Sequence, residues 1–380
     1  MKFKLLNINN LYINVVLVVI STLFLFINKN FDTLKIYAIW ILIINIIGFL
    51  RCYKNWYTCI IYGFILWSNY SIIVANFFSD FDTMFVGWKE NLEVMTVSMN
   101  ILAIFSLIIT IFACSIFNVF GTSQRQESFF KNTPNNPLIV VLISIVLILI
   151  CIFAFTKPSV QGERGIPSPL YEYSIVFFIV AFYYSNKKIE RMFLSAILIL
   201  FVAQNLMYGG RVTALQLIIC WFLIFLSHKV KFYQVLPFLF LGILIFVGIG
   251  ASRAQFSLSI NSLIFSFNKL FESRLTLDTA FAAFYTSGTF LQTKEIISFN
   301  EQMRLFGCYL LSIFGGGKIA DSNLAAYTLK YFTHYFGGVL PFFAYFYLGY
   351  VGVISIACYV IMLLKKVLSN CTEKKQLKKC

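Results

Sequence analysis

The chain has 380 residues, of which 60% are hydrophobic and only 12% are charged, and its mean hydropathy is +0.83. A water-soluble domain cannot bury that much apolar surface, so the composition excludes a soluble globular protein. The net charge of +15 does not indicate a nucleic-acid-binding protein, because the basic residues lie in short segments between apolar runs and form no clustered basic face. The positive-inside rule of membrane proteins accounts for them better.

Apolar runs of about 17 to 25 residues predict membrane-spanning helices, because that length crosses roughly 30 Å of hydrocarbon. The first run follows Lys2 and Lys4, but no small-residue cleavage site comes after it, so we expect a retained span rather than a signal peptide. In chain order, the predicted spans are residues 11–28, 36–50, 57–78, 95–120, 137–155, 171–185, 192–208, 212–227, 234–250 and 339–364. The predicted fold class is an all-α polytopic integral membrane protein with about ten transmembrane helices.

The distribution of lysine and arginine between successive connections predicts that both termini are cytoplasmic. In that orientation, seventeen Lys and Arg residues fall in the inside segments and six in the short outside connections. Shifting the assignment by one span would remove this bias.

The connection 251–338 is too long for a simple turn, so we expect it to have structure of its own. It contains apolar stretches at 275–291 and 305–314, which are too short or too polar to be assigned as spans. The second is expected to be interfacial or re-entrant, and counting one or both as spans would give eleven or twelve. The predicted organisation is a membrane domain of nine spans (1–250), one large periplasmic loop (251–338), a final span (339–364) and a basic cytoplasmic tail (365–380).

Arginines at the predicted outer boundary are the first candidates for chemistry, because ionisable groups are expensive there unless they have a function. Arg211 follows Gly209 and Gly210, which break an apolar stretch and allow a tight turn. A guanidinium beside a helix start suits a phosphate or pyrophosphate. Arg253 comes directly after the ninth span and is a second candidate for the same ligand. The alternative for both is an arginine that anchors a helix end at the interface.

The large loop holds the remaining candidates. His334, just before the final span, is the only histidine predicted to lie outside, and a neutral imidazole can act as a general base near pH 7. A hydrogen-bonding role for this histidine is the alternative. Arg274 and Arg304 are further cationic candidates, although Glu272 and Asp278 offer Arg274 an ordinary ion pair.

Several sequence signals of other function classes are missing. The chain has no P-loop, no metalloprotease histidine pair, no Asp-x-Asp pair and no Ser-His nucleophile pattern. The nine cysteines are scattered, and most lie inside apolar runs without metal-ligand spacing. We therefore expect no metal and no cofactor, and an enzyme of this kind would act on the outer side on an already activated substrate.

The chain resembles the oligosaccharide repeat-unit polymerases that make O-antigen and capsular polysaccharide. The resemblance depends on the span number, on Gly209-Gly210-Arg211 at the start of a span, on the large loop before the last span, and on the run from His334 to Gly338. Arg304 and Gly315 also fit an arginine–glycine spacing of that family.

The resemblance implies a glycosyltransferase that moves a growing glycan from undecaprenyl pyrophosphate to a new lipid-linked repeat unit. Arg211 and Arg253 would stabilise the leaving pyrophosphate, and His334 would orient or deprotonate the acceptor hydroxyl. Arg274 and Arg304 would contact substrate, and Tyr285, Tyr309 and Tyr327 offer rings for stacking on sugars. The partners implied are lipid-linked oligosaccharides, membrane lipids and a chain-length regulator, with no nucleic acid, at a bacterial inner (plasma) membrane.

Two other functions stay open at this point. An O-antigen ligase would transfer finished polymer to another lipid acceptor, and a flippase or transporter would use the arginines as substrate-binding charges. No internal repeat is evident, which disfavours an inverted-repeat transporter. A scaffold without catalytic or transport activity would not explain why a Gly-Gly-Arg sequence lies at the start of a predicted span.

Overall fold

The computed structural model describes the chain as a set of α-helices with one two-stranded β-hairpin. The described residues are 2–27, 30–53, 55–78, 91–119, 134–156, 166–208, 212–252, 274–276, 278–315, 319–334 and 337–376, with the single positions 264 and 268. They divide into two compact units: unit 1 comprises residues 1–122 and 273–380, and unit 2 comprises residues 123–272.

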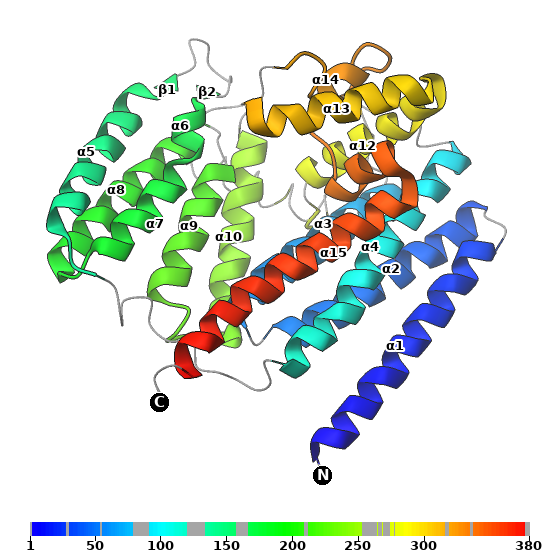
Figure 1. The fold of residues 1–380 in the computed structure, drawn as a ribbon, viewed down its shortest axis with the longest axis horizontal. Helices are drawn as coiled ribbons and strands as arrows, with labels where there is room; N and C mark the ends of the chain where they lie inside the picture. The colour runs from blue at the N-terminus through cyan, green and yellow to red at the C-terminus, as the bar shows by residue number, and fades with distance from the viewer. Residues whose placement is uncertain are drawn as a thin grey trace. The chain divides into compact units, whose positions relative to one another are not determined.

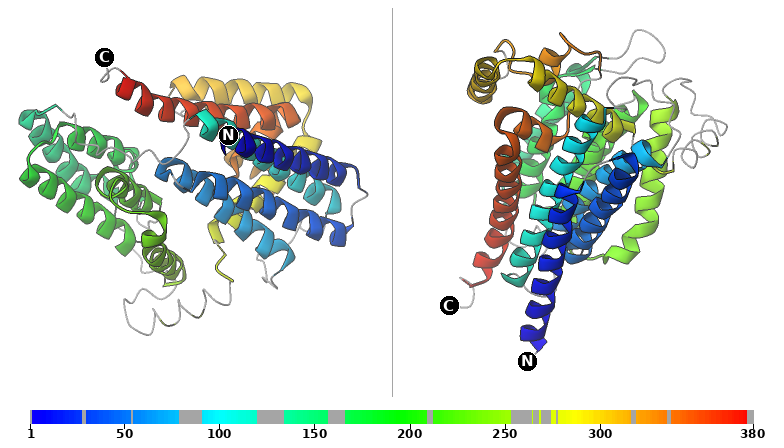
Figure 2. Two further views of the ribbon diagram at one scale, coloured as in Figure 1. Left: turned by 90° about the horizontal axis from the view of Figure 1, so that it is seen from below. Right: turned by 90° about the vertical axis from the view of Figure 1, so that its right-hand side faces the viewer.

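Unit 1 contains eight of the described helices (Figure 1). They are α1 (Lys2–Phe26), α2 (Phe31–Cys52), α3 (Trp56–Phe77), α4 (Leu92–Val119), α12 (Asp278–Ile296), α13 (Phe299–Gly315), α14 (Leu324–Thr328) and α15 (Leu340–Gln376). In this unit, α4 packs against both α2 and α15, and α12 packs against α3, α4 and α15. Helices from both ends of the chain therefore share one bundle, as the views in Figure 2 also show.

Unit 2 is a smaller helical bundle with the hairpin at one end. Its elements are α5 (Pro137–Phe153), β1 (Phe155–Thr156), β2 (Ile166–Pro167), α6 (Pro169–Glu172), α7 (Ser174–Tyr184), α8 (Lys188–Met207), α9 (Val212–Phe225) and α10 (Phe232–Ser252). The strands pair antiparallel, with Phe155 opposite Pro167. Helix α5 packs on α7 and α8, and α8 packs on α9.

The apolar helices have the composition of an all-α membrane protein. Among the described residues, five helical segments are long and apolar enough to cross a membrane: α2, α3, Leu92–Phe112 of α4, α8 and Leu340–Lys365 of α15. Five shorter apolar helices are Leu11–Phe26, Pro137–Phe153, Ser174–Tyr184, Val212–Phe225 and Phe232–Gly242. Each predicted span overlaps one of these ten segments, while the number that cross a membrane and their orientation stay predictions. The span expected at 171–185 is divided, because the chain leaves helical geometry at Tyr173 between α6 and α7.

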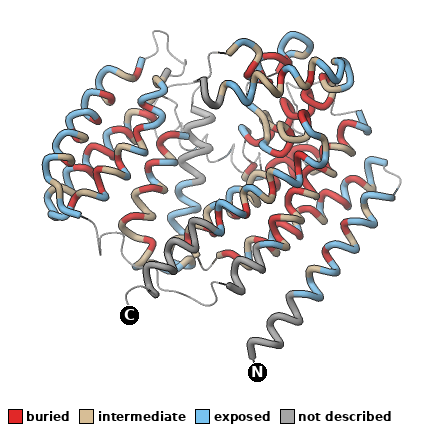
Figure 3. The backbone as a smooth tube through the Cα atoms, viewed as in Figure 1, coloured by how far each residue is buried: buried red, intermediate tan, exposed pale blue. Residues whose placement is uncertain are grey.

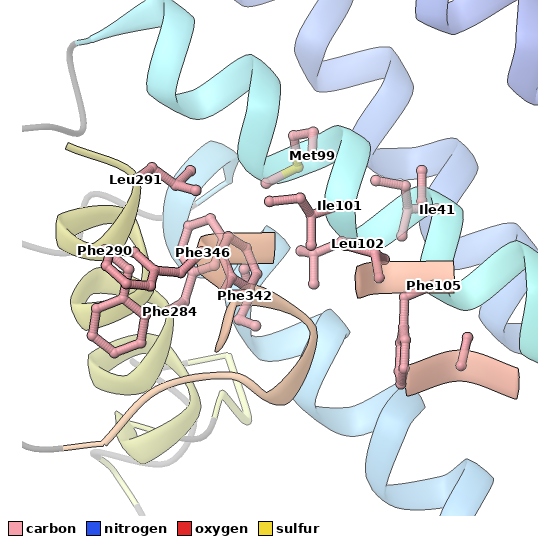
Figure 4. Close-up of a cluster of buried hydrophobic side chains, with 14 of the residues drawn as sticks. Ile41, Met99, Ile101, Leu102, Phe105, Phe284, Phe290, Leu291, Phe342 and Phe346 are labelled. Carbon is pink, nitrogen blue, oxygen red and sulfur yellow. The ribbon is translucent and has the colours of Figure 1, made fainter. Parts of the chain in front are cut away.

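Buried residues of unit 1 concentrate where α12, α3 and α4 meet (Figure 3). Figure 4 shows part of this core, in which side chains of α4 and α12 meet the first turns of α15. Phe284 and Phe290 of α12 and Phe342 and Phe346 of α15 are fully buried in it. Two stretches of the predicted outer loop, 275–291 and 305–314, thus coincide with helices α12 and α13, and α12 contributes to the same core as α2 and α4.

Polar side chains also join α2, α3 and α4 inside the bundle. Asn69 of α3 donates from Nδ2 to Asn45 Oδ1 of α2 at 3.1 Å and to Ser106 Oγ of α4 at 3.2 Å. Close packing accompanies these bonds, because a Cβ added at Gly48 would lie 2.6 Å from Thr110 Oγ1. In lipid, the hydrophobic effect does not drive apolar helices together. Interhelical hydrogen bonds and close packing at small residues supply the attraction instead.

The last helix, α15, is interrupted at Gly349. Its φ of 60° and ψ of −149° are not helical and belong to a region that only glycine adopts readily. The chain bends so sharply that the carbonyl group of Ala344 occupies the space that a Cβ would take at Gly352. The sequence predicts one continuous span over 339–364, and the structure instead divides it into residues 340–348 and a second helical part from 350 onward.

Candidate functional site

The predicted pyrophosphate site lies mostly outside the described residues. Neither Arg211 nor Arg253 is among them. The helix boundary expected at the two glycines is confirmed, since α8 ends at Met207 and α9 begins at Val212. Helix α10 ends at Ser252, next to Arg253 in the chain. Whether the two arginines converge on one ligand stays a prediction.

A buried polar network holds the end of α8 that precedes the Gly-Gly-Arg sequence. The Tyr171 hydroxyl of α6 donates to Gln204 Oε1 at 2.9 Å and accepts from Asn205 Nδ2 at 2.9 Å. Gln204 Nε2 in turn donates to the Cys151 carbonyl of α5 at 3.1 Å. The Phe155 ring contacts the Tyr171 ring, with centroids 5.1 Å apart. These hydrogen bonds within an apolar bundle fix the last turn of α8 against α5 and α6.

His334 is buried and hydrogen-bonded. Its Nε2 lies 2.8 Å from Thr328 Oγ1, at the end of α14. The Thr328 hydroxyl is also placed to donate to the Ala325 carbonyl, at 3.1 Å. Toward Nε2 it accepts or donates according to the tautomer of the imidazole, and a neutral imidazole in either tautomer has one N–H and one lone-pair nitrogen.

The segment that follows His334 is packed tightly onto α12. Gly337 has a φ of 122°, and a Cβ at Gly338 would lie 2.6 Å from the Phe343 ring and 2.7 Å from the Phe290 ring. The positive φ of Gly337 favours glycine, and a side chain at Gly338 would require the two rings to move. The Gly-Gly pair of the resemblance thus has a local packing role next to the histidine in the chain.

Arg304 lies in an exposed, charge-balanced network on α13. It donates from Nε and Nη2 to the two Glu301 carboxylate oxygens at 2.8 and 2.7 Å, and from Nη2 to Asp321 Oδ2 at 2.9 Å. Lys330 Nζ donates to Asp321 Oδ1 at 2.9 Å. Two cations and two carboxylates therefore neutralise each other, and a substrate would contact Arg304 together with its carboxylate partners.

These contacts shift the carboxyl pKa values downward. Hydrogen bonds from Arg304 and then from Tyr327 lower the pKa of Glu301 to about 2, and bonds from Lys330 and Arg304 lower the pKa of Asp321. Because the folded pKa of each carboxyl lies below the unfolded value, the network adds stability at pH above roughly 4.3 and loses it as the pH falls toward the folded pKa.

We expect the Glu301 carboxyl to titrate near pH 2 in the folded protein. In Arg304→Gln, which removes the guanidinium, its midpoint should rise toward the ordinary glutamate value of roughly 4.3. The carboxyl carbon shift of labelled glutamate, followed by NMR against pH in detergent, measures both midpoints. An ordinary midpoint in the unmodified protein would contradict the bidentate contact.

The tyrosines predicted to stack on sugars differ in exposure. Tyr285 and Tyr327 are buried, at 7% and 5% exposed, whereas Tyr309 is 40% exposed. The Tyr327 hydroxyl donates to Glu301 Oε1 at 2.9 Å, and Lys330 Nζ lies 4.4 Å from its ring centroid. Tyr309 stacks on Tyr347 with centroids 5.6 Å apart. Stacking on a ligand is therefore more accessible to Tyr309 than to the other two.

Arg274 connects the start of the segment 274–334 to α3. Its guanidinium donates to the Phe78 carbonyl, and its own carbonyl accepts from the Tyr70 hydroxyl at 2.8 Å. The next carbonyl, of Leu275, accepts from Trp67 Nε1 at 3.2 Å. Arg274 and Leu275 both have positive φ, 51° and 61°. This geometry supports a turn-forming role for the arginine in addition to the predicted contact with substrate.

The structure thus brings Arg304 and Tyr327 together through Glu301, and His334 lies close in sequence to both Tyr327 and Lys330. Sequence reasoning missed Glu301 and Asp321 as partners; the i, i+3 spacing of Glu301 and Arg304 was the available signal for one of them. Within the described ranges, no group of three or more His, Cys, Asp or Glu residues is placed to hold a metal ion. Comparison with protein-family models, with curated proteins and with solved structures finds no match for this chain.

Proposed function

We propose that the chain is a membrane glycosyltransferase that polymerises lipid-linked oligosaccharide repeat units. The growing glycan is transferred from undecaprenyl pyrophosphate to the acceptor hydroxyl of a new repeat unit, at the outer face of a bacterial inner membrane. The observation that supports this best is the segment between α10 and α15, in which a buried histidine is hydrogen-bonded to Thr328, while Arg304 and Tyr327 share the Glu301 carboxylate and Arg304 also bonds to Asp321.

In this proposal, the chemistry needs no cofactor. Glycosyl transfer breaks the bond between the sugar and the pyrophosphate, and the acceptor hydroxyl loses its proton as the new glycosidic bond forms. Arg211 and Arg253 stabilise the charge that develops on the departing pyrophosphate. His334 accepts the proton of the acceptor hydroxyl or orients this hydroxyl. The segment 274–334 contacts the sugars through Arg274, Arg304 and Tyr309.

The test is the length profile of surface polysaccharide in a deletion strain. Complementation with the unmodified gene should restore a ladder of polymer lengths, and complementation with Arg211→Ala should leave zero or one repeat unit. Arg164→Ala, which removes another arginine expected on the outer side, is the matched control and should restore the ladder. Protein levels in the membrane must be equal. A normal ladder with Arg211→Ala would refute the assigned role of this arginine.

The same deletion strain separates the alternatives. Loss of an O-antigen ligase leaves long polymer on the carrier lipid, whereas loss of the polymerase leaves single repeat units. Loss of a flippase instead leaves repeat units on the cytoplasmic side of the membrane. An unchanged ladder in the deletion strain would reject all three functions for this glycan.

A further inference from the structure

Helix α13 exposes a row of apolar side chains. Phe299 is 70% exposed, Leu310 42% and Leu311 60%, and Met303 is half-buried between them in the chain. Phe299, Met303 and Leu310 follow one another at spacings of four and seven residues, which places them on one side of an α-helix. These four residues form the apolar side of α13. Large apolar side chains gathered on one exposed surface mark a contact with another molecule or with lipid.

The rest of the α13 surface is divided between a buried side and a charged side. Gln302 and Leu305 are buried where the helix packs against the bundle. Asn300 and Arg304, four residues apart, are exposed on another side, where Arg304 bonds to the Glu301 carboxylate. The exposed part of the helix thus has one apolar and one charged side. This is the arrangement of a helix that lies at the boundary between lipid and water.

The position of α13 on α15 supports lipid as the contact. The Tyr309 ring stacks on the Tyr347 ring of α15, with centroids 5.6 Å apart. Leu348 and Val351, which follow in α15, are exposed and apolar. They belong to the segment Leu340–Lys365, which is long and apolar enough to cross a membrane. Helix α13 therefore lies beside a helix that lipid would surround, near the end at which α15 begins (Figure 1).

The size and the charge of this surface disfavour other occupants. An interface between two protein molecules takes about 20–30 residues from each partner, whereas the apolar side consists of four residues of one helix. Arg304 and Lys330 are matched by Glu301 and Asp321, so these four side chains carry no net charge to attract an anionic partner. Burial of apolar side chains among acyl chains is then the driving force.

We propose that α13 is an interfacial helix whose apolar side contacts the acyl chains of one membrane leaflet. The leaflet is the one at which α15 begins, predicted to be the outer one. A re-entrant arrangement would place the charged side in hydrocarbon, which is expensive. The inference depends on membrane insertion of the chain and not on the proposed polymerase activity. For the candidate site it fixes a depth, because Arg304 and Glu301 are held at the level of the lipid headgroups.

Photocrosslinking in a bilayer tests the contact. The full chain, with its native cysteines, is placed in nanodiscs of phosphatidylethanolamine and phosphatidylglycerol. The photoreactive residue p-benzoylphenylalanine, which reacts with C–H bonds on irradiation, replaces either Phe299 or Leu310. In the matched control it replaces Asn300 on the charged side. The yield of phospholipid adduct, measured by mass spectrometry of the intact protein, should be about fivefold higher at 299 and 310 than at 300, because an interfacial helix buries its apolar side among acyl chains.

Equal yields at the three positions, or no phospholipid adduct at 299 and 310, would overturn the proposal. A crosslink between two copies of the chain at these positions would overturn it as well. Replacing phosphatidylglycerol by phosphatidylcholine should leave the yields unchanged, and a yield that falls with the anionic lipid would overturn apolar burial as the driving force. Phe299 and Leu310 are exposed, so the larger side chain does not enter the core. If one of these chains still fails to fold, Leu311 provides a further position for the same comparison.

Discussion

Gly352→Ala is expected to lower the stability of unit 1 by about 3 kcal/mol or more, the upper end of what an overpacked methyl group costs. A Cβ at this position would overlap the carbonyl oxygen of Ala344, and its carbonyl carbon would lie 2.8 Å away. Both are backbone atoms, so no side-chain rotation can relieve the contact. Relief requires the two parts of α15 to separate at the bend. The fraction of monodisperse protein after detergent extraction, and its Tm, measure the effect.

The matched control for this prediction is Gly307→Ala in α13. The chemical change is the same, but a Cβ at Gly307 meets nothing within 4 Å. Because alanine is the better helix former by about 1 kcal/mol in a helix interior, this variant should be as stable as the unmodified protein or slightly more stable. If Gly352→Ala behaved like Gly307→Ala, the close crossing of residues 344 and 352 would be wrong.

The helices themselves were largely predictable from sequence. Hydropathy and length are local properties, and a run such as 137–155 predicts α5 at Pro137–Phe153 because nearly every residue in it is apolar. The residues that start a helix are local signals as well. Asn136 caps α5 by accepting from the Ile139 N–H at 3.3 Å, and Pro137 follows it at the first helical position. The same reasoning placed the boundary between α8 and α9 at the two glycines.

The bend in α15 was not predictable in this way. Gly349 and Gly352 lie three residues apart in one apolar run, and nothing in the local sequence distinguishes the glycine that bends the helix from the one that is packed against it. The side chains that donate to carbonyls just before the bend, Lys294 to Tyr345 and Gln302 to Tyr347, come from helices more than forty residues earlier in the chain. Such contacts depend on how α12 and α13 pack, which hydropathy does not encode.

In the candidate site, too, the sequence predicts the residue types but not their contacts. The sequence identifies which residue types lie near the predicted outer boundary, but burial and pairing depend on the folded segment. Arg304 has one carboxylate partner at i−3, visible in the sequence, and a second, Asp321, that only the turn before α14 brings near. The burial of His334 and its hydrogen bond with Thr328 likewise depend on the folded chain around the end of α14.

Gln302→Leu is expected to destabilise the protein by about 2–4 kcal/mol, because the buried carbonyls of Phe346 and Tyr347 both lose the Gln302 Nε2 donor and each buried hydrogen bond left unmade costs about 1–3 kcal/mol. Leucine has a similar volume, so the change removes the hydrogen bonds without a large cavity. Gln302 is only 6% exposed, which leaves little access for water to replace the amide.

The control is Gln292→Leu, the same substitution on the neighbouring helix α12, at a position that forms none of the bonds to α15 found among the described residues. Thermal unfolding in one detergent compares the two variants with the unmodified chain. We expect a lower Tm for Gln302→Leu alone. Lys294→Met should add to that loss by less than its own separate effect, because residues 345 to 347 are already frayed once Gln302 is replaced. Equal Tm values for the two glutamine variants would mean that the carbonyls at the end of residues 340–348 need no donor from α13.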